Sequence, residues 1–278
     1  MIRLGINGFG RIGRLALRRA LSRADVEVVA INDLAAPKAL SYLFERDSVH
    51  GRYQGSVALE DGNLVVDGVP IRLTAHRDPR ECAWGSVGVD VVLESTGVFT
   101  HRDKAAMHLE AGARRVLISA PATNPDLTVC AGVNHQALAT GGPYEVVSNA
   151  SCTTNCVAPV LKALHDAYEV TSGVLNTVHA YTMGQGLLDS PSKNLRRGRA
   201  AALNLVPTST GAARAVGEVM PDLKGKLDGL AIRTPNPTGS LADLTLTLAK
   251  APELEEVIAI DIAADLVRQA FFLAHSVN

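Results

Sequence analysis

Two residues of this chain have the types and positions needed for nucleophilic chemistry by a thiol. Cys152 follows a predicted strand and lies in the first turn of a predicted helix, Ser151–Tyr168. Unpaired backbone N–H groups and the helix dipole stabilise a thiolate there. His179 follows a predicted strand, Val174–Val178, and an imidazole at such a position can take the thiol proton and act as an acid or base. An inert, buried cysteine and a structural histidine are the alternatives that spacing alone leaves open.

A glycine-rich segment near the N-terminus has the pattern of a dinucleotide-binding turn. Gly8-Phe9-Gly10-Arg11-Ile12-Gly13 lies between a predicted strand, Ile2–Asn7, and a predicted helix, Arg14–Ser22, and Asp33 follows Gly13 by twenty positions. The first glycine permits the tight turn, the second lets the backbone approach a pyrophosphate, and the third lets helix and strand pack closely. Asp33 would accept hydrogen bonds from the ribose hydroxyls and repel a 2′-phosphate, which favours NAD over NADP. A structural turn with an unrelated aspartate is the alternative.

The predicted elements around this turn alternate between strands and helices. Val26–Ile31, Val89–Glu94 and Val116–Ile118 are apolar runs typical of strands buried on both faces. They predict an α/β fold with a Rossmann-type, doubly wound parallel sheet. Thr96 follows one of these strands and would lie at the carboxyl edge of the sheet, where ligands bind in such folds. An ordinary turn at the end of the strand explains Thr96 equally well.

Other patterns indicate a second domain with a different sheet. Leu241–Leu248 alternates apolar and polar residues, as a half-buried antiparallel strand does. Asp61-Gly62 and Asp67-Gly68 predict hairpin turns within the first domain. We therefore expect a dinucleotide-binding domain over 1–150, an α+β domain with a mostly antiparallel sheet over 151–250, and a helix within 251–278 that could pack back on the first domain.

Composition excludes several classes of protein. The 278 residues carry a net charge of −1 and no apolar run long enough to span a bilayer, which argues against a nucleic-acid-binding or membrane protein. The four cysteines match neither a disulfide framework nor a zinc site, so we expect no metal. The first residues lack the features of a signal peptide, so we expect a cytoplasmic protein. The basic run Lys193–Arg199 alone is poor evidence for nucleic acid.

Longer motifs resemble those of a known family, the phosphorylating, NAD-dependent glyceraldehyde-3-phosphate dehydrogenases. Ser148–Cys156 reads SNASCTTNC, the active-site motif of that family, which is long and specific. The resemblance continues in order over roughly residues 1 to 250. Further matching segments are Asn7–Arg14, Ile31–Asp33, Asp47–Arg52, Glu94–Phe99, Gly132–His135, Thr177–Thr182 and Val206–Ala213.

The resemblance implies a role for each matching residue. Cys152 would attack the substrate aldehyde, and His179 would activate the thiol and take the hydroxyl proton during hydride transfer to NAD. Inorganic phosphate would then release an acyl phosphate from the Cys152 thioester. Thr182 and Arg233 would bind the substrate phosphate. The attacking phosphate would be bound by Ser151, Thr153, Thr210 and Gly211, with Arg197 nearby, and NAD by Gly8, Phe9, Gly10, Arg11, Ile12, Gly13, Asp33, Arg77, Thr96 and Ser119.

The chain departs from the family pattern after Leu241–Leu248. Family members continue for several dozen residues, with further strands and an Asn-Glu-x-Gly-Tyr motif whose asparagine orients the nicotinamide, whereas 251–278 contains no such motif. We therefore expect a shortened catalytic domain and altered self-association. The resemblance also places Lys193–Arg199 in a loop that lines a neighbouring subunit's cofactor site, which implies a homo-oligomer. An erythrose-4-phosphate dehydrogenase and an NAD-binding relative with impaired catalysis are the alternative functions.

Overall fold

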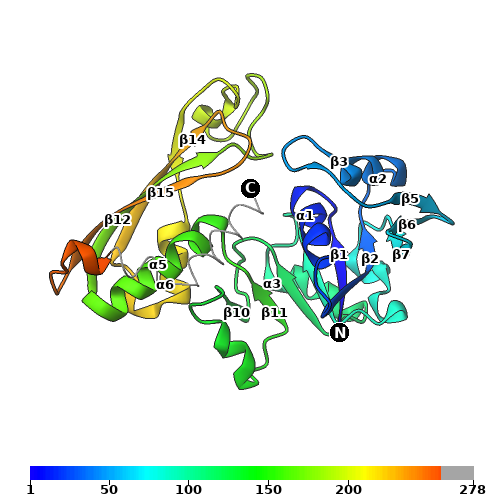
Figure 1. The fold of residues 1–278 in the computed structure, drawn as a ribbon, viewed down its shortest axis with the longest axis horizontal. Helices are drawn as coiled ribbons and strands as arrows, with labels where there is room; N and C mark the ends of the chain where they lie inside the picture. The colour runs from blue at the N-terminus through cyan, green and yellow to red at the C-terminus, as the bar shows by residue number, and fades with distance from the viewer. Residues whose placement is uncertain (258–278) are drawn as a thin grey trace. The chain divides into compact units, whose positions relative to one another are not determined.

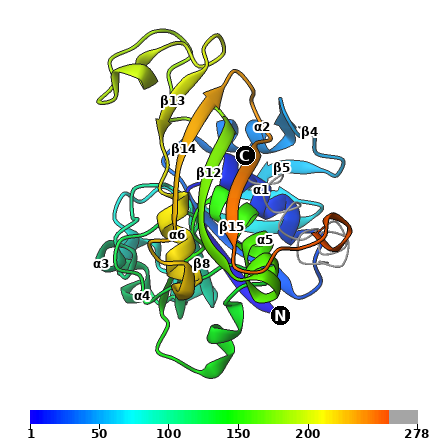
Figure 2. The ribbon, with the colours of Figure 1, turned by 90° about the vertical axis from the view of Figure 1, so that its left-hand side faces the viewer.

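The computed structural model of the protein describes residues 1–257, which form two compact units (Figure 1, Figure 2). The first unit consists of Met1–Thr128 and Gly141–Asn149, and the second of Val129–Thr140 and the chain from Ala150 onward. The C-terminal helix expected within 251–278 lies, past residue 257, outside the described residues. Within residues 1–257, no helix is long and apolar enough to cross a membrane.

A nine-stranded sheet forms the centre of the first unit. From one edge to the other its strands are β10 (Leu127–Thr128), β11 (Val146–Ser148), β9 (Arg115–Ile118), β8 (Val91–Glu94), β1 (Ile2–Asn7), β2 (Val26–Asn32), β7 (Val69–Thr74), β6 (Asn63–Val66) and β5 (Val57–Glu60). Strands β10 to β7 pair in parallel, and β5, β6 and β7 pair antiparallel. The connection from β1 to β2 runs to one side and the return to β8 to the other, so the order reverses beside β1. Doubly wound sheets bind their ligands at this switch point, and the predicted Rossmann-type sheet is confirmed.

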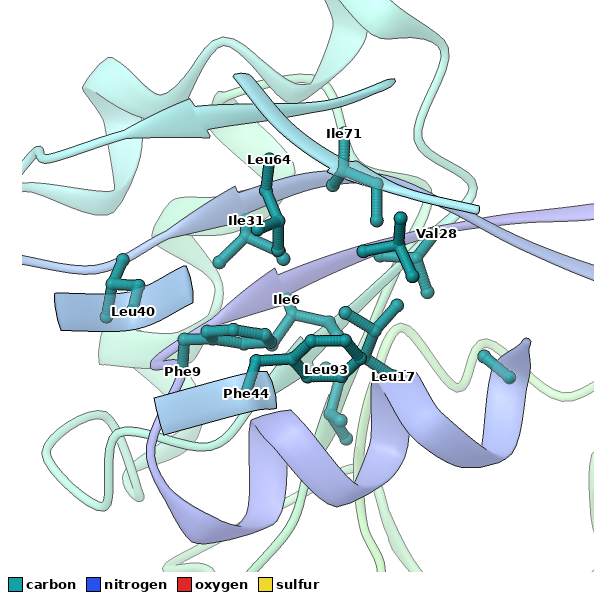
Figure 3. Close-up of a cluster of buried hydrophobic side chains, with 12 residues drawn as sticks. Ile6, Phe9, Leu17, Val28, Ile31, Leu40, Phe44, Leu64, Ile71 and Leu93 are labelled. Carbon is teal, nitrogen blue, oxygen red and sulfur yellow. The ribbon is translucent and has the colours of Figure 1, made fainter. Parts of the chain in front are cut away.

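Apolar side chains from the helices fill the space above this sheet. Phe9, Leu17 and Phe44 pack with Ile6 of β1 and Leu64 of β6 in one fully buried cluster (Figure 3). Leu17 belongs to α1 and Phe44 to α2, so the hydrophobic effect stabilises the packing of both helices against the strands. Apart from α1 and α2, the helical segments of this unit are short. The helices and minor strands are α1 (Arg11–Ala20), α2 (Pro37–Glu45), α3 (Arg102–Ala105), α4 (Met107–Glu110), the 3-10 segments η1 (Pro79–Cys82) and η2 (Trp84–Val87), and the two-stranded ladder β3 (Arg46–Asp47) and β4 (Gly51–Arg52).

In the first unit, the predicted hairpin turns are present, but one predicted helix begins at a different residue. Both hairpin turns are confirmed: Asp61 and Gly62 have φ of 49° and 78°, and Asp67 and Gly68 have φ of 51° and 79°. Two successive positive φ angles define the turn that matches the twist of a hairpin. The predicted helix Arg14–Ser22 begins three residues earlier, at Arg11, because Gly10 has an extended conformation and acts as the N-cap.

The second unit packs two helices against a four-stranded sheet. The helices are α5 (Cys152–Tyr168) and α6 (Ala212–Val219), and the strand order is β13 (Val206–Ser209), β14 (Leu227–Thr234), β12 (Val170–Ala180) and β15 (Leu241–Leu248). Two of the three strand pairs are antiparallel, and only β12 and β14 are parallel. The mostly antiparallel sheet is confirmed, although β12 is longer than the predicted Val174–Val178. The shorter 3-10 segments are η3 (His135–Thr140), η4 (Leu195–Gly198) and η5 (Pro221–Leu223).

Candidate active site

The N-terminus of α5 presents the thiol of Cys152. Ser151 is the N-cap: its Oγ accepts a hydrogen bond from Thr154 N at 3.0 Å and lies 2.8 Å from Thr154 Oγ1. Asn155 Nδ2 donates to the Ser151 carbonyl oxygen at 3.0 Å, which holds the preceding turn. Cys152 is half-buried and occupies the first position of the helix. The predicted location of this thiol, in the field of a helix N-terminus, is therefore confirmed by the fold.

His179 lies near the end of β12 with its ring directed at this thiol. The Cys152 Sγ and His179 Nε2 atoms are 3.4 Å apart, and the histidine is 5% exposed. Its Nδ1 lies 2.7 Å from the carbonyl oxygen of Ala180; because this oxygen can only accept, a hydrogen on Nδ1 satisfies the contact, and Arg233 Nη1 then donates to the Ala180 oxygen and not to the ring nitrogen. In the neutral ring Nε2 then has a free lone pair facing the thiol. The two side chains have the arrangement of a nucleophile and its general base.

Arg233 reaches the same histidine because of the strand register. The parallel pairing of β12 with β14 sets Arg233 opposite His179, and Arg233 Nη1 lies 3.0 Å from His179 Nδ1 and 2.9 Å from the Ala180 oxygen. The same Nη1 is 3.5 Å from Thr182 Oγ1. Among the described residues, the buried Nε of Arg233 has no hydrogen-bond partner. A guanidinium beside a hydroxyl group is suited to an oxyanion.

Burial and charge determine the protonation of these groups. Burial lowers the pKa of His179, the bond to Ala180 opposes that shift, and the positive charge of Arg233 lowers it further. Burial also lowers the pKa of Arg233, as does the charge of Arg197, whereas Cys152 raises it. His179 is therefore held as a neutral base, and Arg197 acts on Arg233 as a neighbouring like charge.

The other predicted phosphate-binding residues lie on three segments: Thr153 in the first turn of α5, Arg197 in η4, and Thr210 and Gly211 between β13 and α6. Arg197 Nε donates to Thr208 Oγ1 at 2.9 Å, a partner that the sequence did not indicate. Thr210 Oγ1 accepts from Ala212 N at 3.2 Å, and Gly211 is the N-cap of α6, with no side-chain cap. Thr153 is 8% exposed. Hydroxyl groups, backbone N–H groups and a guanidinium are thus available, as phosphate oxygens require.

The remaining three cysteines differ from Cys152. Cys82 and Cys130 are buried, and burial raises their pKa values to about 12 and about 11. Cys156 is half-buried, and burial together with the charge of Cys152 raises its pKa. A thiol with a raised pKa stays protonated and unreactive at neutral pH, so these three cysteines are poor nucleophiles.

The glycine-rich turn of the first unit has the geometry expected of a pyrophosphate-binding turn. Gly8 has φ of 91°, and its N–H donates to the Asn32 carbonyl oxygen at 2.8 Å. A Cβ atom on Gly13 would collide with the Gly8 carbonyl oxygen, so Gly13 permits close packing of α1 on β1. A Cβ on Gly10 would meet no atom within 4 Å, so internal packing does not explain that glycine. Helix α1 starts without a side-chain cap, which leaves backbone donors for an anion.

The acidic residue after β2 is tied to the turn itself. Asp33 Oδ2 accepts from Phe9 N at 2.7 Å, and Oδ1 accepts from Ala35 N at 2.8 Å. The carboxylate is thus fixed beside the turn, and each oxygen retains a lone pair for a ribose hydroxyl. Arg11 and Ile12 form the first turn of α1 and are half-buried. These residues and the glycines fit a dinucleotide.

The other three residues predicted to bind the cofactor differ in their positions: two lie at the carboxyl edge of the sheet and one lies in an exposed segment. Thr96 follows β8 and donates to Glu94 Oε1 through its N–H, at 2.8 Å, and its hydroxyl group, at 2.5 Å. Ser119 follows β9, and its Oγ donates to the Glu94 carbonyl oxygen at 3.0 Å. Both therefore lie at the carboxyl edge of the sheet, next to the switch point. Arg77 is exposed in the segment after β7.

The comparisons with known proteins agree with both units. Residues 2–102 match the family model for the glyceraldehyde 3-phosphate dehydrogenase NAD binding domain, and residues 151–268 match the model for the C-terminal domain. The chain is 53% identical to glyceraldehyde-3-phosphate dehydrogenase of Geobacillus stearothermophilus over 93% of its own length and 77% of the relative's. The corresponding figures are 52%, 93% and 77% for glyceraldehyde-3-phosphate dehydrogenase 1 of Bacillus subtilis, and 53%, 93% and 78% for the Mycobacterium leprae enzyme. The chain belongs to the glyceraldehyde-3-phosphate dehydrogenase family, and its first unit contains the NAD-binding domain of that family.

Proposed function

We propose that this protein oxidises and phosphorylates glyceraldehyde 3-phosphate to 1,3-bisphosphoglycerate with NAD, a reaction of glycolysis. The observation that carries the proposal is the distance of 3.4 Å between Cys152 Sγ and His179 Nε2, at a helix N-terminus and beside Arg233. A thiol nucleophile, a base and a cation in one place are the groups that thioester chemistry on a phosphorylated aldehyde requires.

The protein's own groups account for each proton and bond in the reaction. His179 Nε2 takes the Cys152 proton, the thiolate adds to the aldehyde carbon, and His179 returns that proton to the former carbonyl oxygen to give a thiohemiacetal. NAD, when bound, supplies the acceptor for the hydride that leaves this carbon. His179 takes the proton of the thiohemiacetal hydroxyl, which gives a thioester on Cys152. An oxygen of inorganic phosphate then attacks the acyl carbon, and the Cys152 thiolate leaves.

We also assign two anion sites to this protein. The guanidinium of Arg233 and the hydroxyl of Thr182, 3.5 Å apart, are the groups that we assign to the phosphate of the substrate. We assign the attacking phosphate to a second set, Ser151, Thr153, Arg197, Thr210 and Gly211. In that set the N-terminus of α6 adds backbone donors and the favourable end of its dipole.

For NAD, we assign Gly8 to Gly13 to the pyrophosphate, Asp33 to the adenosine ribose, and Arg77, Thr96 and Ser119 to further contacts. Substitution of Asp33 tests this assignment, because we expect its carboxylate both to bind ribose hydroxyls and to repel a 2′-phosphate. We expect Asp33→Ala to weaken NAD binding by roughly 10- to 100-fold, the size expected when hydrogen bonds to a charged group are lost. NADP should bind this variant almost as well as NAD does. Fluorescence titration with both cofactors measures the ratio, and an unchanged preference for NAD would remove Asp33 from this role.

Turnover tests the proposed reaction directly. Purified protein given glyceraldehyde 3-phosphate, NAD and inorganic phosphate should form NADH continuously. Without phosphate, NADH formation should stop after about one equivalent per active site, because the thioester has no efficient acceptor. Erythrose 4-phosphate serves as the comparison substrate. Continuous turnover of erythrose 4-phosphate without phosphate, and none of glyceraldehyde 3-phosphate, would contradict the proposal.

We further propose that the protein is a cytoplasmic homo-oligomer. Support comes from the segment 183–205, in which six large apolar side chains are 67% to 91% exposed: Met183, Leu187, Leu188, Leu195, Leu203 and Leu205. Such exposed groups usually mark a contact with another protein surface. All four cysteines are free thiols, as is usual in a reducing compartment. Light scattering that gave the mass of a single chain at micromolar concentration would contradict self-association.

A further inference from the structure

A buried carboxylate lies directly beneath the turn that we assign to NAD. Glu94, at the end of β8, is 1% exposed. Its Oε2 accepts from Asn7 Nδ2 at 2.6 Å and lies 3.1 Å from His108 Nε2, and its Oε1 accepts from the N–H and the hydroxyl group of Thr96. Burying a charge is costly unless it is hydrogen-bonded. The four contacts explain how the carboxylate can be buried, and make its position sensitive to each partner.

The tautomer of His108 is fixed by the single tryptophan of the chain. Trp84 Nε1, which can only donate, lies 2.9 Å from His108 Nδ1. His108 Nδ1 must therefore be the acceptor, and the hydrogen of the neutral ring is on Nε2, directed at Glu94. Trp84 and His108 are both fully buried. With Nδ1 accepting from Trp84, Nε2 is the ring nitrogen that donates to the carboxylate.

The same network connects the ends of three adjacent strands. Asn32, at the end of β2, donates from Nδ2 to Asn7 Oδ1 at 2.8 Å, and Asn7 and Glu94 end β1 and β8. Ser95 Oγ donates to the Gly8 carbonyl oxygen at 2.7 Å. A Cβ on Gly8 would lie 2.7 Å from Thr96 N, so the turns after β1 and β8 are in close contact. A shift of Glu94 would therefore displace Thr96 and, through it, the glycine-rich turn.

We propose that His108 is a positioning residue of the NAD site. It holds the Glu94 carboxylate, and Glu94 in turn holds Thr96 and the first glycine of the turn in the geometry that receives the cofactor. His108 itself touches no cofactor in this account, since it is buried behind Glu94. The inference rests on the proposed function of the first unit as the NAD site. It adds that NAD binding requires one hydrogen bond, from His108 Nε2–H to Glu94.

Two substitutions at this position separate hydrogen bonding from packing. His108→Leu fills a similar volume and makes no hydrogen bond, whereas His108→Gln can donate to Glu94 and accept from Trp84. We expect His108→Leu to raise the Kd for NAD by about tenfold or more, the effect of removing a hydrogen bond to a charged group. His108→Gln should bind NAD within about threefold of the unchanged protein. Amide exchange at Thr96 should become faster in the leucine variant only.

A matched control separates positioning from loss of stability. Ile71→Ala removes side-chain volume from a fully buried position on β7, outside the network, and it should destabilise the unit without changing the Kd for NAD. Equal weakening by Ile71→Ala, or equal weakening by the leucine and glutamine variants, would overturn the inference. Absence of NAD binding by the unchanged protein would instead contradict the proposed function.

Spectroscopy on the unchanged protein tests the tautomer without any variant that could fail to fold. Nitrogen chemical shifts of the His108 ring, obtained with labelled histidine, distinguish protonated from unprotonated ring nitrogens. We expect an unprotonated Nδ1 and a protonated Nε2, with the Trp84 indole N–H protected from exchange. A hydrogen on Nδ1, or a rapidly exchanging indole N–H, would overturn the inference even where His108→Leu does not fold.

Discussion

Cys152→Ser is expected to abolish NADH formation while NAD binding persists. A serine hydroxyl is a far weaker nucleophile than a thiolate at neutral pH, and the neutral His179 cannot compensate for that difference. The rate should fall by about 10⁴-fold or more, as it does when the nucleophile of a coupled catalytic unit is removed. The glycine-rich turn is in the other compact unit, so the Kd for NAD should change by less than about twofold. Steady-state turnover and titration with NAD measure the two effects on one preparation.

The matched control for that variant lies one helical turn further along α5. Cys156→Ser changes the same atom type in the same helix, but the pKa of Cys156 is raised by burial and by Cys152, so it is no nucleophile. This variant should keep turnover within about twofold of the unchanged protein. Retained turnover in Cys152→Ser, or equal loss in the two variants, would remove Cys152 from its assigned role.

Sequence patterns predicted the parts of this protein that depend on short-range geometry. The turn at Gly8 needs a positive φ, the hairpin turns at Asp61 and Asp67 need two in succession, and Ser151 caps the helix that begins at Cys152. Each of these features is determined by a few neighbouring residues. The sequence predicts that α1 begins at Arg14, three residues after its actual start at Arg11, because the N-cap Gly10 has no side chain and gives no start signal in the sequence.

Features that depend on strand register could not be predicted from spacing. Arg233 meets His179 across 54 residues because β12 and β14 pair in parallel, whereas the alternation of residues in each strand is equally compatible with an antiparallel pair. The network of Asn7, Glu94 and His108 was missed for the same reason. Its only sequence signal is that a polar residue ends each of two adjacent apolar strands, and nothing in the sequence connects those residues with a histidine on α4.

The register of β12 and β14 also places the base His179 and the cation Arg233 next to each other. Burial lowers the pKa of His179, and the charge of Arg233, whose Nη1 lies 3.0 Å from the ring, lowers it further. A bound phosphate at Arg233 would partly neutralise that charge and would raise the basicity of the neighbouring imidazole. Under the proposed assignment of the substrate phosphate to Arg233, substrate binding and activation of the base would be linked through a single side chain.

His179→Asn is expected to lower kcat/KM by about 10² to 10⁴-fold, the usual contribution of a general acid and base. Asparagine can still form a hydrogen bond near Cys152 but cannot take a proton at neutral pH. The thiol should also react more slowly with iodoacetamide at pH 7, because less thiolate is present. Turnover and alkylation measured together distinguish this result from a general loss of structure, which would expose and accelerate the thiol.

The pH profile provides the matching test of how His179 works. Burial and the charge of Arg233 lower its pKa below the ordinary value of 6.5, and the neutral form is the one that accepts a proton. Activity should therefore persist as the pH falls through 6.5 and decline only below it. The acid limb should disappear from the residual activity of His179→Asn, since the group responsible for it has gone. A limb at or above pH 6.5 in the unchanged protein, or an acid limb that survives in the variant, would show that a different group controls the reaction.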